Sequence, residues 1–537
     1  MASVAATEAE ELSTSDVRLV IAASSLGTVF EWYDFFIYGT LATIIGRTFF
    51  PADSEVAQLL LALAGFAVGF GVRPLGAVLF GHLGDKLGRK YTFLVTITLM
   101  GLATAAVGLV PSAASIGIAA PAILLVLRVI QGLALGGEYG GAAIYVAEHA
   151  SAEKRGFYTS FIQGSVAGGF ILSLVVVLAT EAALGEAAWN AWGWRIPFLF
   201  SLLLLAISLW MRLKLSESPV FRAMKEAGEI ARNPLKETFT YPGNGRRLFV
   251  ALFGIAAGLT VIWYTAMFQV LYFLQNAMKL APSTAQTLVG VGAGAGLVWF
   301  VLFGWLSDRV GRKAPIVTGY LLTLVLLFPL FGMMGKAANP DLAEAARRAP
   351  IVVGGADCHY NPFDKVQDGA CGRALDMLSK RGVPYSINPA LVGVIIGHER
   401  ISIGHYPSEA ELDSALAAAG YDLRQVQPSG GRIAVILLGI IVLSALSGMT
   451  YGPVAALLSE LFPARIRYSS MSIPYHIGTG YFGGFLPFVS QYIIAKTGDP
   501  YSGLWYTWAV VAMATLVTLL FLRRGDTQEL DPAGRSR

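Results

Sequence analysis

Long apolar runs, separated by short polar segments, recur along nearly the whole chain. Most of these runs have about 20 residues or more, which is the length that a helix needs to cross the hydrocarbon core of a bilayer. We place twelve membrane-spanning helices in the chain, near residues 18–46, 57–80, 91–111, 120–146, 157–180, 194–213, 247–277, 284–306, 314–335, 433–459, 468–494 and 501–522. The pattern predicts an all-α membrane protein that is embedded in the lipid bilayer.

Composition agrees with this fold class and argues against several others. Of the 537 residues, 55% are hydrophobic and 14% are charged, whereas a soluble domain has about 25% charged residues. The net charge is only +4, so we expect no nucleic-acid partner. Six histidines and two cysteines are too few to indicate an enzyme, a metal site or a cofactor, and the histidines are scattered over the chain.

Lysine and arginine are unevenly distributed between the loops on the two sides of the predicted membrane. Loops on one side are basic, at 86–90, 154–155, 212–247, 309–313 and 465–467, whereas the short loops on the other side hold Arg47, Lys279 and Lys496. Basic loops remain in the cytoplasm. We therefore expect a multi-pass protein of a bacterial-type inner membrane, with cytoplasmic tails at 1–17 and 523–537 and a cytoplasmic linker at 214–246.

A ten-residue motif occurs twice in the chain. The run GHLGDKLGRK at 81–90 returns 223 residues later, at 304–313, as GWLSDRVGRK. A second landmark agrees, because Glu148 and Arg155, seven residues apart, have counterparts 312 residues later. Such a repeat indicates that the chain has two homologous halves.

The two halves differ in length. The second offset exceeds the first by 89 residues, so an insert must lie between the two landmarks of the second half. We assign residues 18–213 to the first half and 247–522 to the second, and we place the insert near 336–432, between the ninth and tenth spans. The orientation of the basic loops places this insert on the periplasmic side.

Other short runs accompany the repeated motif. They are TVFEWYD at 28–34, RVIQG at 128–132, GWRIPF at 193–198 and SESP at 216–219. With these runs the chain resembles the metabolite:proton symporter family of the major facilitator superfamily, which includes bacterial permeases for α-ketoglutarate, shikimate, citrate and proline or betaine. The resemblance covers the chain apart from the insert and the tails. It implies two pseudo-symmetric six-helix halves, a substrate site between them near the midplane, and a monomer. The long insert departs from the family pattern, so the substrates of individual members do not carry over.

Charged side chains within the spans are candidates for proton coupling, because each costs roughly 2.5 to 3.5 kcal/mol at the bilayer centre on insertion scales. Glu31 and Asp34 lie one turn apart on the first span. They repel each other, and loss of water favours a protonated carboxyl group, so either can carry a proton. Glu138 on the fourth span and His476 on the eleventh are further candidates. The alternatives are buried ion pairs for the acids and a packed histidine.

Two buried arginines are candidates for contact with a substrate anion. Arg73 lies 12 residues before Asp85, which is about 18 Å along a helix and hence near the middle of the bilayer. Arg128 lies further toward the outer side. The neutral side chains that could complete a substrate site are Gln163, Tyr264, Gln269 and Tyr475. Buried ion pairs for the arginines and ordinary helix packing for the neutral residues are the alternatives.

The repeated motif has a mechanical interpretation. In the family that the chain resembles this loop is a gate lock, and the matching residues here are Gly81, Asp85, Gly88, Arg89, Asp308, Gly311 and Arg312. Glycine permits close approach of two backbones, and an aspartate can pair with an arginine or meet the N-terminus of a neighbouring helix. The alternative is a basic turn without a gating role.

The two cysteines both lie in the predicted insert. Cys358 and Cys371 are 13 residues apart, and in an oxidising compartment we expect them to form a disulfide. A zinc site that uses His359 is the alternative. Later in the insert, Ser408 is predicted to cap a short helix over 409–419.

Together these observations predict a secondary active transporter that takes up a small carboxylate or zwitterion with protons by alternating access. No Walker phosphate-binding loop occurs in the sequence, so we do not expect ATP to drive transport. The same fold could instead serve a uniporter, an antiporter or an exporter. A membrane sensor whose insert binds a ligand is a further alternative from another class.

Overall fold

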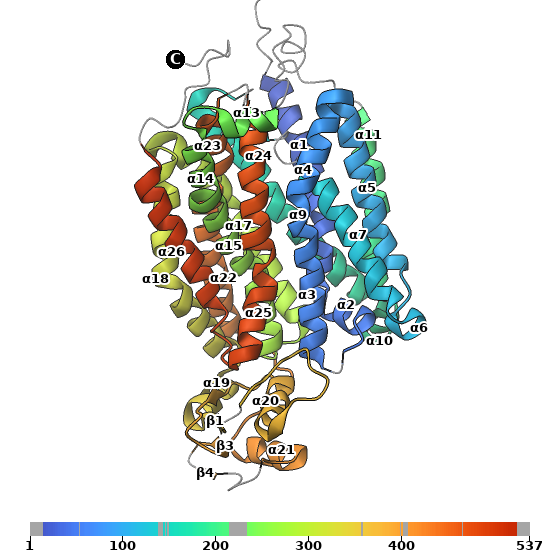
Figure 1. Ribbon diagram of the computed structural model, residues 1–537, viewed down its shortest axis with the longest axis vertical. Helices are drawn as coiled ribbons and strands as arrows, with labels where there is room; N and C mark the ends of the chain where they lie inside the picture. The colour runs from blue at the N-terminus through green and yellow to red at the C-terminus, as the bar shows by residue number, and fades with distance from the viewer. Residues whose placement is uncertain are drawn as a thin grey trace, which may run out of the picture.

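Two helical bundles lie side by side, and a small α/β lobe covers one end of them (Figure 1). The computed structural model describes residues 14–52, 54–87, 89–137, 143–144, 146–147, 150–213, 234–355, 358–397, 399–400, 406–463 and 466–523. Five sequence-based predictions lie wholly or largely outside these residues: the N-terminal tail, the C-terminal tail, most of the cytoplasmic linker, Glu138 and Gly88. We call the end that carries the lobe the lobe end, and the opposite one the gate end.

The first bundle is formed by the N-terminal half of the chain. Its elements are α1 (Thr14–Thr40), α2 (Ala42–Phe49), α3 (Glu55–Gly71), α4 (Arg73–Leu87), α5 (Arg89–Leu109), α6 (Ala113–Ile116), α7 (Ala119–Gly136), η1 (Ala152–Lys154), α9 (Arg155–Leu184), α10 (Glu186–Ala191), η2 (Gly193–Arg195) and α11 (Ile196–Leu213). Helix α1 packs on α9, and α5 packs on α11. All the long helices described in this half have regular α geometry.

The second bundle contains helices with wider turns. Its elements are α13 (Pro234–Thr240), α14 (Asn244–Phe249), η3 (Val250–Ala256), α15 (Ala257–Tyr264), η4 (Thr265–Gln269), α16 (Val270–Tyr272), η5 (Phe273–Ala277), α17 (Pro282–Val310), α18 (Lys313–Ala338), α22 (Gly430–Tyr451), α23 (Val454–Leu461), α24 (Arg467–Ile477), η7 (Gly478–Gly484), α25 (Leu486–Thr497) and α26 (Leu504–Phe521). The segments η3, η4, η5 and η7 are π-helical. Such turns keep backbone groups hydrogen-bonded in lipid and often mark functional regions.

Within the described residues, nine helices are long and apolar enough to cross a membrane. They are Glu55–Phe80, Ala119–Gly136, Ala152–Leu184, Gly193–Met211, Asn244–Ala277, Pro282–Val310, Lys313–Ala338, Gly430–Leu461 and Leu504–Phe521. The other predicted spans, near 18–46, 91–111 and 468–494, are also helical over most of their length. The count of twelve spans stays a prediction.

The lobe corrects the expectation that the chain is all α. It contains α19 (Pro340–Arg348), β1 (Ile351–Gly354), α20 (Gly369–Arg381), β2 (Ser386–Ile387), β3 (Gly393–Ile396), β4 (Glu399–Arg400) and α21 (Glu409–Ala418). The strands form one sheet in the order β2-β1-β3-β4, in which β1 is parallel to β2 and antiparallel to β3. Strands of two to four residues are too short for an alternating pattern to be recognised in the sequence.

Two predictions about the insert are confirmed by the lobe. Cys358 and Cys371 form a disulfide, with Cα atoms 5.1 Å apart. The hydroxyl of Ser408 accepts a hydrogen bond from the Glu411 amide, and the Ser408 amide donates one to the Glu411 carboxylate, so α21 is capped as expected. His359 belongs to no group of possible metal ligands among the described residues.

Candidate functional site

A narrow cavity lies between the two bundles, about midway along their length. It has room for roughly one water-sized molecule. Its walls come from both halves and are Trp32, Phe36, Arg73, Val166, Thr260, Trp263, Tyr264, Tyr451 and Thr479. Most of these residues are aromatic, and Arg73 is the charged residue among them.

Arg73 is fully buried beside the cavity. Helix α3 ends at Gly71 and α4 begins at Arg73, so the guanidinium lies at a break between two helical segments. Its Cζ atom is 5.1 Å from the centroid of the Trp32 ring and 5.2 Å from that of Phe70. Aromatic faces hold a cation in this way without neutralising its charge. The rings therefore fix the position of the guanidinium at the wall of the cavity.

The polar groups that the second half places near the cavity are tyrosine hydroxyls and a histidine ring. The hydroxyls of Tyr451 and Tyr475 share a hydrogen bond of 2.7 Å. His476 is fully buried, and the charge of Arg73 acts on it and on Tyr451. Neither ring nitrogen of His476 has a hydrogen-bond partner among the described residues, and the same holds for the Tyr264 hydroxyl. Buried polar groups of this kind are available to a bound ligand.

The two acids of the first span lie in the first half and are not among the residues that line the cavity. Glu31 and Asp34 are buried and interact electrostatically with each other. The neighbouring Tyr33 donates a hydrogen bond of 2.6 Å to the carbonyl of Pro197, which fixes this part of α1 against α11. Within the described residues, Oδ1 of Asp34 has no hydrogen-bond partner. Burial makes the ionised form of a carboxyl group costly unless its charge is compensated.

Arg128 is held inside the first half and does not line the cavity. Its Cζ atom lies 4.4 Å from the ring centroid of Phe35 and 4.3 Å from that of Tyr38. Its Nη1 donates a hydrogen bond to Gln131, whose amide donates to the Thr104 hydroxyl. No carboxylate pairs with Arg128 in the part of the chain that the structure describes, so the buried ion pair considered for it is not seen there.

The other predicted substrate residues occupy different positions. Tyr264 lines the cavity. Tyr475 does not line it, but its hydroxyl is hydrogen-bonded to that of Tyr451, which does. Gln163 is buried in α9 but is not among the lining residues. Gln269 accepts a hydrogen bond of 3.2 Å from Gln491 and belongs to the second half's interior.

Sequence reasoning missed several lining residues, among them Trp32, Phe36, Tyr451 and Thr479. A signal for Trp32 was present, because it lies between the two acids of the first span. Phe36 lies one helical turn after Trp32 and so shares its face of α1. Nothing comparable distinguishes Tyr451 or Thr479 from ordinary packing residues of a span.

Aromatic rings close the cavity toward the lobe end. Phe36 of the first half stacks on Trp263 of the second, with ring centroids 5.0 Å apart. Phe268 packs against Phe66 and Phe36, at 5.5 and 5.6 Å. One turn further, the Tyr272 hydroxyl donates a hydrogen bond of 2.7 Å across the seam to the Gly39 carbonyl.

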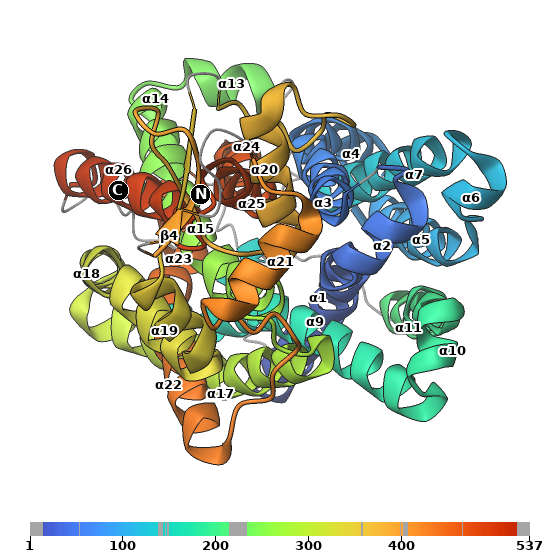
Figure 2. The ribbon, with the colours of Figure 1, turned by 90° about the horizontal axis from the view of Figure 1, so that it is seen from below.

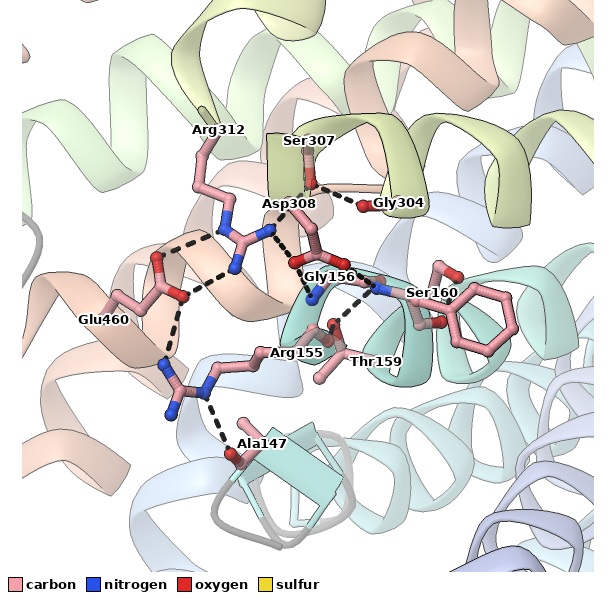
Figure 3. Close-up of polar contacts among 11 residues, drawn as sticks. Ala147, Arg155, Gly156, Thr159, Ser160, Gly304, Ser307, Asp308, Arg312 and Glu460 are labelled. Carbon is pink, nitrogen blue, oxygen red and sulfur yellow. Dashed lines mark hydrogen bonds and ion pairs between the residues drawn. The ribbon is translucent and has the colours of Figure 1, made fainter. Parts of the chain in front are cut away.

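Charged residues close the gate end, and Glu460 is their centre (Figure 3). Its carboxylate accepts hydrogen bonds from Arg312 at 2.9 and 3.2 Å and from Arg155 at 3.3 Å. Arg155 belongs to the first half, whereas the other two belong to the second. Nε of Arg155 also donates to the Ala147 carbonyl at 3.0 Å. The ion pairs therefore tie the two halves together at this end.

Asp308 of the second half caps a helix of the first. Its two carboxylate oxygens accept hydrogen bonds from the backbone amides of Gly156 and Phe157, at 2.8 and 2.9 Å, at the start of α9 (Figure 3). Arg312 pairs with the same carboxylate. Asp308 thus makes both contacts that the sequence suggested for its counterpart Asp85, an arginine pair and a helix N-terminus.

Glycine permits this close approach at the gate end. A Cβ atom at Gly304 would lie 2.6 Å from the Gly156 carbonyl oxygen, so α9 and α17 could not pack this closely with a larger residue. Gly311 ends α17 with φ of +86°, a left-handed conformation that favours glycine. In the first copy of the motif, the side chains of Asp85 and Arg89 lie outside the described residues, and so does the surrounding of Gly81.

Comparison with known proteins identifies relatives of the whole chain. Residues 19–248 match the family model described as sugar (and other) transporter. The chain is 30% identical to the inner membrane metabolite transport protein YhjE of Escherichia coli, with 95% of each chain covered. It is 38% identical to the shikimate transporter of the same organism, over 60% of this chain and 73% of the relative. These relatives are transporters and not enzymes.

The fold has close counterparts among solved structures. A crystal structure of the D-xylose-proton symporter superposes with a TM-score of 0.60, covering 94% of this chain and 98% of the other, at 17% identity. A partially occluded inward-open form of the xylose transporter XylE from Escherichia coli gives a TM-score of 0.59 at 18% identity, covering 96% and 100%. At this identity the likeness establishes the fold alone.

Proposed function

The chain belongs to the metabolite transporters of the major facilitator superfamily, and on that premise we propose that it is a proton-coupled symporter for a small carboxylate or zwitterion. The observation that carries this proposal is the central cavity, in which Arg73 is surrounded by aromatic rings from both halves. A cavity between the two halves, near the midplane, is where alternating access requires the substrate to bind.

The chemistry of the cavity supports an anionic group on the substrate. Arg73 offers a guanidinium that can bind a carboxylate through two parallel hydrogen bonds. The rings of Trp32, Trp263 and Tyr264 would contact a flat or weakly polar body, or the cationic end of a zwitterion. Relatives that are named for their substrates fit this description, among them the shikimate transporter and the α-ketoglutarate permease of Escherichia coli.

Proton coupling is assigned to the first half. Glu31 and Asp34 are buried and close to each other, and Trp32 between them lines the cavity. A proton on one acid relieves both the mutual repulsion and the cost of burial. Because Trp32 also contacts Arg73, a change of charge on the acids can reach the substrate site through α1. His476 and Glu138 remain candidates for a second proton site.

Closure at both ends fits an intermediate of alternating access. Aromatic rings separate the cavity from the lobe end, and the contacts of Glu460 and Asp308 separate it from the gate end. Opening toward the gate end requires the ion pairs to break, whereas opening toward the lobe end requires the aromatic contacts to part. The repeated motif therefore acts as a gate lock, with Asp308, Gly311 and Arg312 in the second half and Gly81, Asp85, Gly88 and Arg89 in the first.

We assign the gate end to the cytoplasm and the lobe to the periplasm, with twelve spans and both tails cytoplasmic, because basic residues gather in the gate-end loops. The disulfide within the lobe supports this orientation, since disulfides persist in oxidising compartments. The test is thiol labelling of Cys358 and Cys371 in intact cells, which should require prior reduction and succeed with a reagent that cannot enter the cytoplasm. Labelling only after lysis would reverse the orientation.

The function is tested in two steps. A thermal-shift screen of the purified protein against organic acids, betaines and amino acids should identify a ligand, because binding raises stability by RT ln(1 + [L]/Kd). Proteoliposomes loaded at higher internal pH should then accumulate that ligand, and a protonophore should abolish the accumulation. Entry only to the external concentration would indicate a uniporter, and entry that depends on an internal counter-substrate would indicate an antiporter. Ligand binding without flux would favour the sensor.

A further inference from the structure

The lobe touches both halves of the protein, although it is inserted in only one of them. It follows α18 and precedes α22, both in the second half. Seen from the lobe end, α20 and α21 lie across the seam between the two bundles (Figure 2). A body in this position must change its contacts with one half whenever the halves separate at this end.

Hydrogen bonds attach the lobe to the second half. Tyr385 donates through its hydroxyl to the Ala495 carbonyl at 3.1 Å and through its amide to Gly498 at 3.3 Å. Lys496 donates to the Tyr360 carbonyl at 2.5 Å. At a separate point, the Val426 amide donates to the Lys279 carbonyl at 2.9 Å. These bonds tie the middle and the C-terminal part of the lobe to loops and helix ends of the second half.

The disulfide loop is part of this attachment. Cys358 and Cys371 close the segment that contains Tyr360 and Phe363. The Phe363 ring is stacked on that of Tyr492 in α25, with centroids 6.2 Å apart. The disulfide thus shapes the surface with which the lobe contacts the second half.

Contact with the first half is of another kind, because it is apolar. Leu60 of α3 is 1% exposed, and it belongs to the hydrophobic core of the lobe together with Leu375 and Leu378 of α20. Val56, one turn earlier on α3, packs against the same cluster. In the part of the chain that the structure describes, every hydrogen bond found between the lobe and the bundles ends in the second half. An apolar contact can part without the loss of any hydrogen bond, whereas a hydrogen-bonded contact parts only when water replaces each bond.

The helices that the lobe joins also meet beside the cavity. The Tyr481 hydroxyl of η7 donates a hydrogen bond of 3.0 Å to the Gly71 carbonyl at the end of α3. A Cβ atom at Gly484 would lie 2.2 Å from the Phe70 ring, so η7 and α3 are in close contact there. This crossing adjoins Arg73, two residues after Gly71. Movement of α3 relative to η7 and α25 therefore changes both the cavity wall and the contact with the lobe.

We propose that the lobe is a latch, which is fixed to the second half and holds α3 of the first half through Leu60, so that the lobe end opens only after this contact is released. The latch deepens the alternating-access cycle proposed above and depends on it. Each cycle exposes the Leu60 contact to water, and the free energy of this contact opposes opening at the lobe end. Weakening the contact should therefore favour the state that is open at the lobe end.

Distances between spin labels test the latch in the full-length protein in lipid nanodiscs, where both ends are accessible. The native cysteines are joined to each other, so they do not react with the label. One pair of labels, at Glu55→Cys and Arg373→Cys, joins α3 to the lobe, and a second, at Arg373→Cys and Asp499→Cys, joins the lobe to the second half; all three positions are exposed. We expect the first pair to show a short and a long distance and the second pair to show a single distance.

Two leucines of α3 provide the variant and its control. Leu60→Gln should raise the ratio of long to short distance in the first pair at least about fivefold. Leu59→Gln, at a partly buried neighbour that packs against the main core of the bundles, should leave that ratio within about twofold of the parent. Equal ratios in the two variants, or a lobe that moves relative to Asp499 instead, would overturn the latch.

A third pair separates failure of the latch from failure of alternating access. Labels at Lys154→Cys and Arg309→Cys, both exposed at the gate end, should report opening there. Two distances at the gate end with a single distance between α3 and the lobe would reject the latch and retain the transport cycle. A single distance at every pair would reject both.

Discussion

The two halves share a ten-residue motif, but they contribute different chemical groups to the central cavity and its surroundings. The first half contributes charge, because Arg73 lines the cavity and Glu31 and Asp34 are buried in the same half. The second half contributes aromatic and hydroxyl groups from helices with π-helical segments, such as η4 and η7. Homologous origin therefore does not imply equivalent roles. A buried charge needs surroundings that keep their positions. A cavity wall that moves during transport needs a backbone whose helical turns can change.

The difference is visible in how each half holds its buried polar groups. Arg128 is enclosed by aromatic rings and bonded to Gln131, and a chain of bonds continues to Thr104. In η7, by contrast, four of the seven residues are glycine, and Thr479 of this segment lines the cavity. We infer that the first half carries the coupling ion and that the second half adapts to the substrate.

Neutralising the acids of the first half should have the largest effect. Glu31→Gln and Asp34→Asn remove the groups that we expect to carry the proton, so accumulation driven by a pH gradient should be lost. Exchange of internal for external substrate should remain largely intact, because exchange needs no net proton transfer. Both activities are measured in the same proteoliposomes. If both variants still accumulate substrate, the coupling site lies elsewhere, and His476 and Glu138 become the first positions to test.

Arg73 and His476 offer a direct comparison of the two halves at one site. Arg73→Ala removes the guanidinium that faces the cavity and should weaken substrate binding roughly 10- to 100-fold, the range for a hydrogen bond to a charged group. His476→Gln removes a titratable ring but no cavity charge, and it should weaken binding less than about tenfold. Binding is measured by calorimetry with the ligand from the thermal-shift screen. A larger loss in His476→Gln would contradict the assignment of anion recognition to the first half.

Breaking the ion pairs at the gate end should shift the conformational equilibrium. Glu460→Gln leaves Arg155 and Arg312, which are largely buried, without their shared carboxylate, so the closed gate should be destabilised and uptake should fall about tenfold. The control is Glu344→Gln, which removes a carboxylate that pairs with Arg347 on the exposed surface of the lobe. Such surface pairs contribute less than about 1 kcal/mol, so uptake should be unchanged. Equal uptake in the two variants would remove the gate role of Glu460.

A glycine substitution tests the π-helical wall with the smallest chemical change. A methyl group at Gly484 would meet the Phe70 ring, and overpacking of this kind costs roughly 1 to 3 kcal/mol. Gly484→Ala should therefore lower the melting temperature by several degrees and reduce uptake several-fold. Gly294→Ala is the matched control, because nothing lies within 4 Å of the added methyl group there. If both variants behave like the parent, close contact between η7 and α3 is not needed.

The sequence alone determined the features that depend on composition and order along the chain. Apolar runs of sufficient length predicted the helices, and the repeated motif predicted two halves with a long insert. The acids of the first span and Arg73 were found because a charge in an apolar run is costly and therefore conspicuous. The disulfide and the cap at Ser408 also followed from local chemistry.

Tertiary structure alone decided which side chains meet. Position in a helix sets depth through the rise of 1.5 Å per residue, but it does not say which helix lies opposite. Thus Arg73 faces the cavity while Arg128 lies inside the first half, although both are arginines within predicted spans. Asp308 caps a helix of the other half, and Leu60 joins the core of the lobe, through contacts between residues more than 100 positions apart. Packing of distant segments chooses such partners, and no local pattern of apolar and polar residues records that choice.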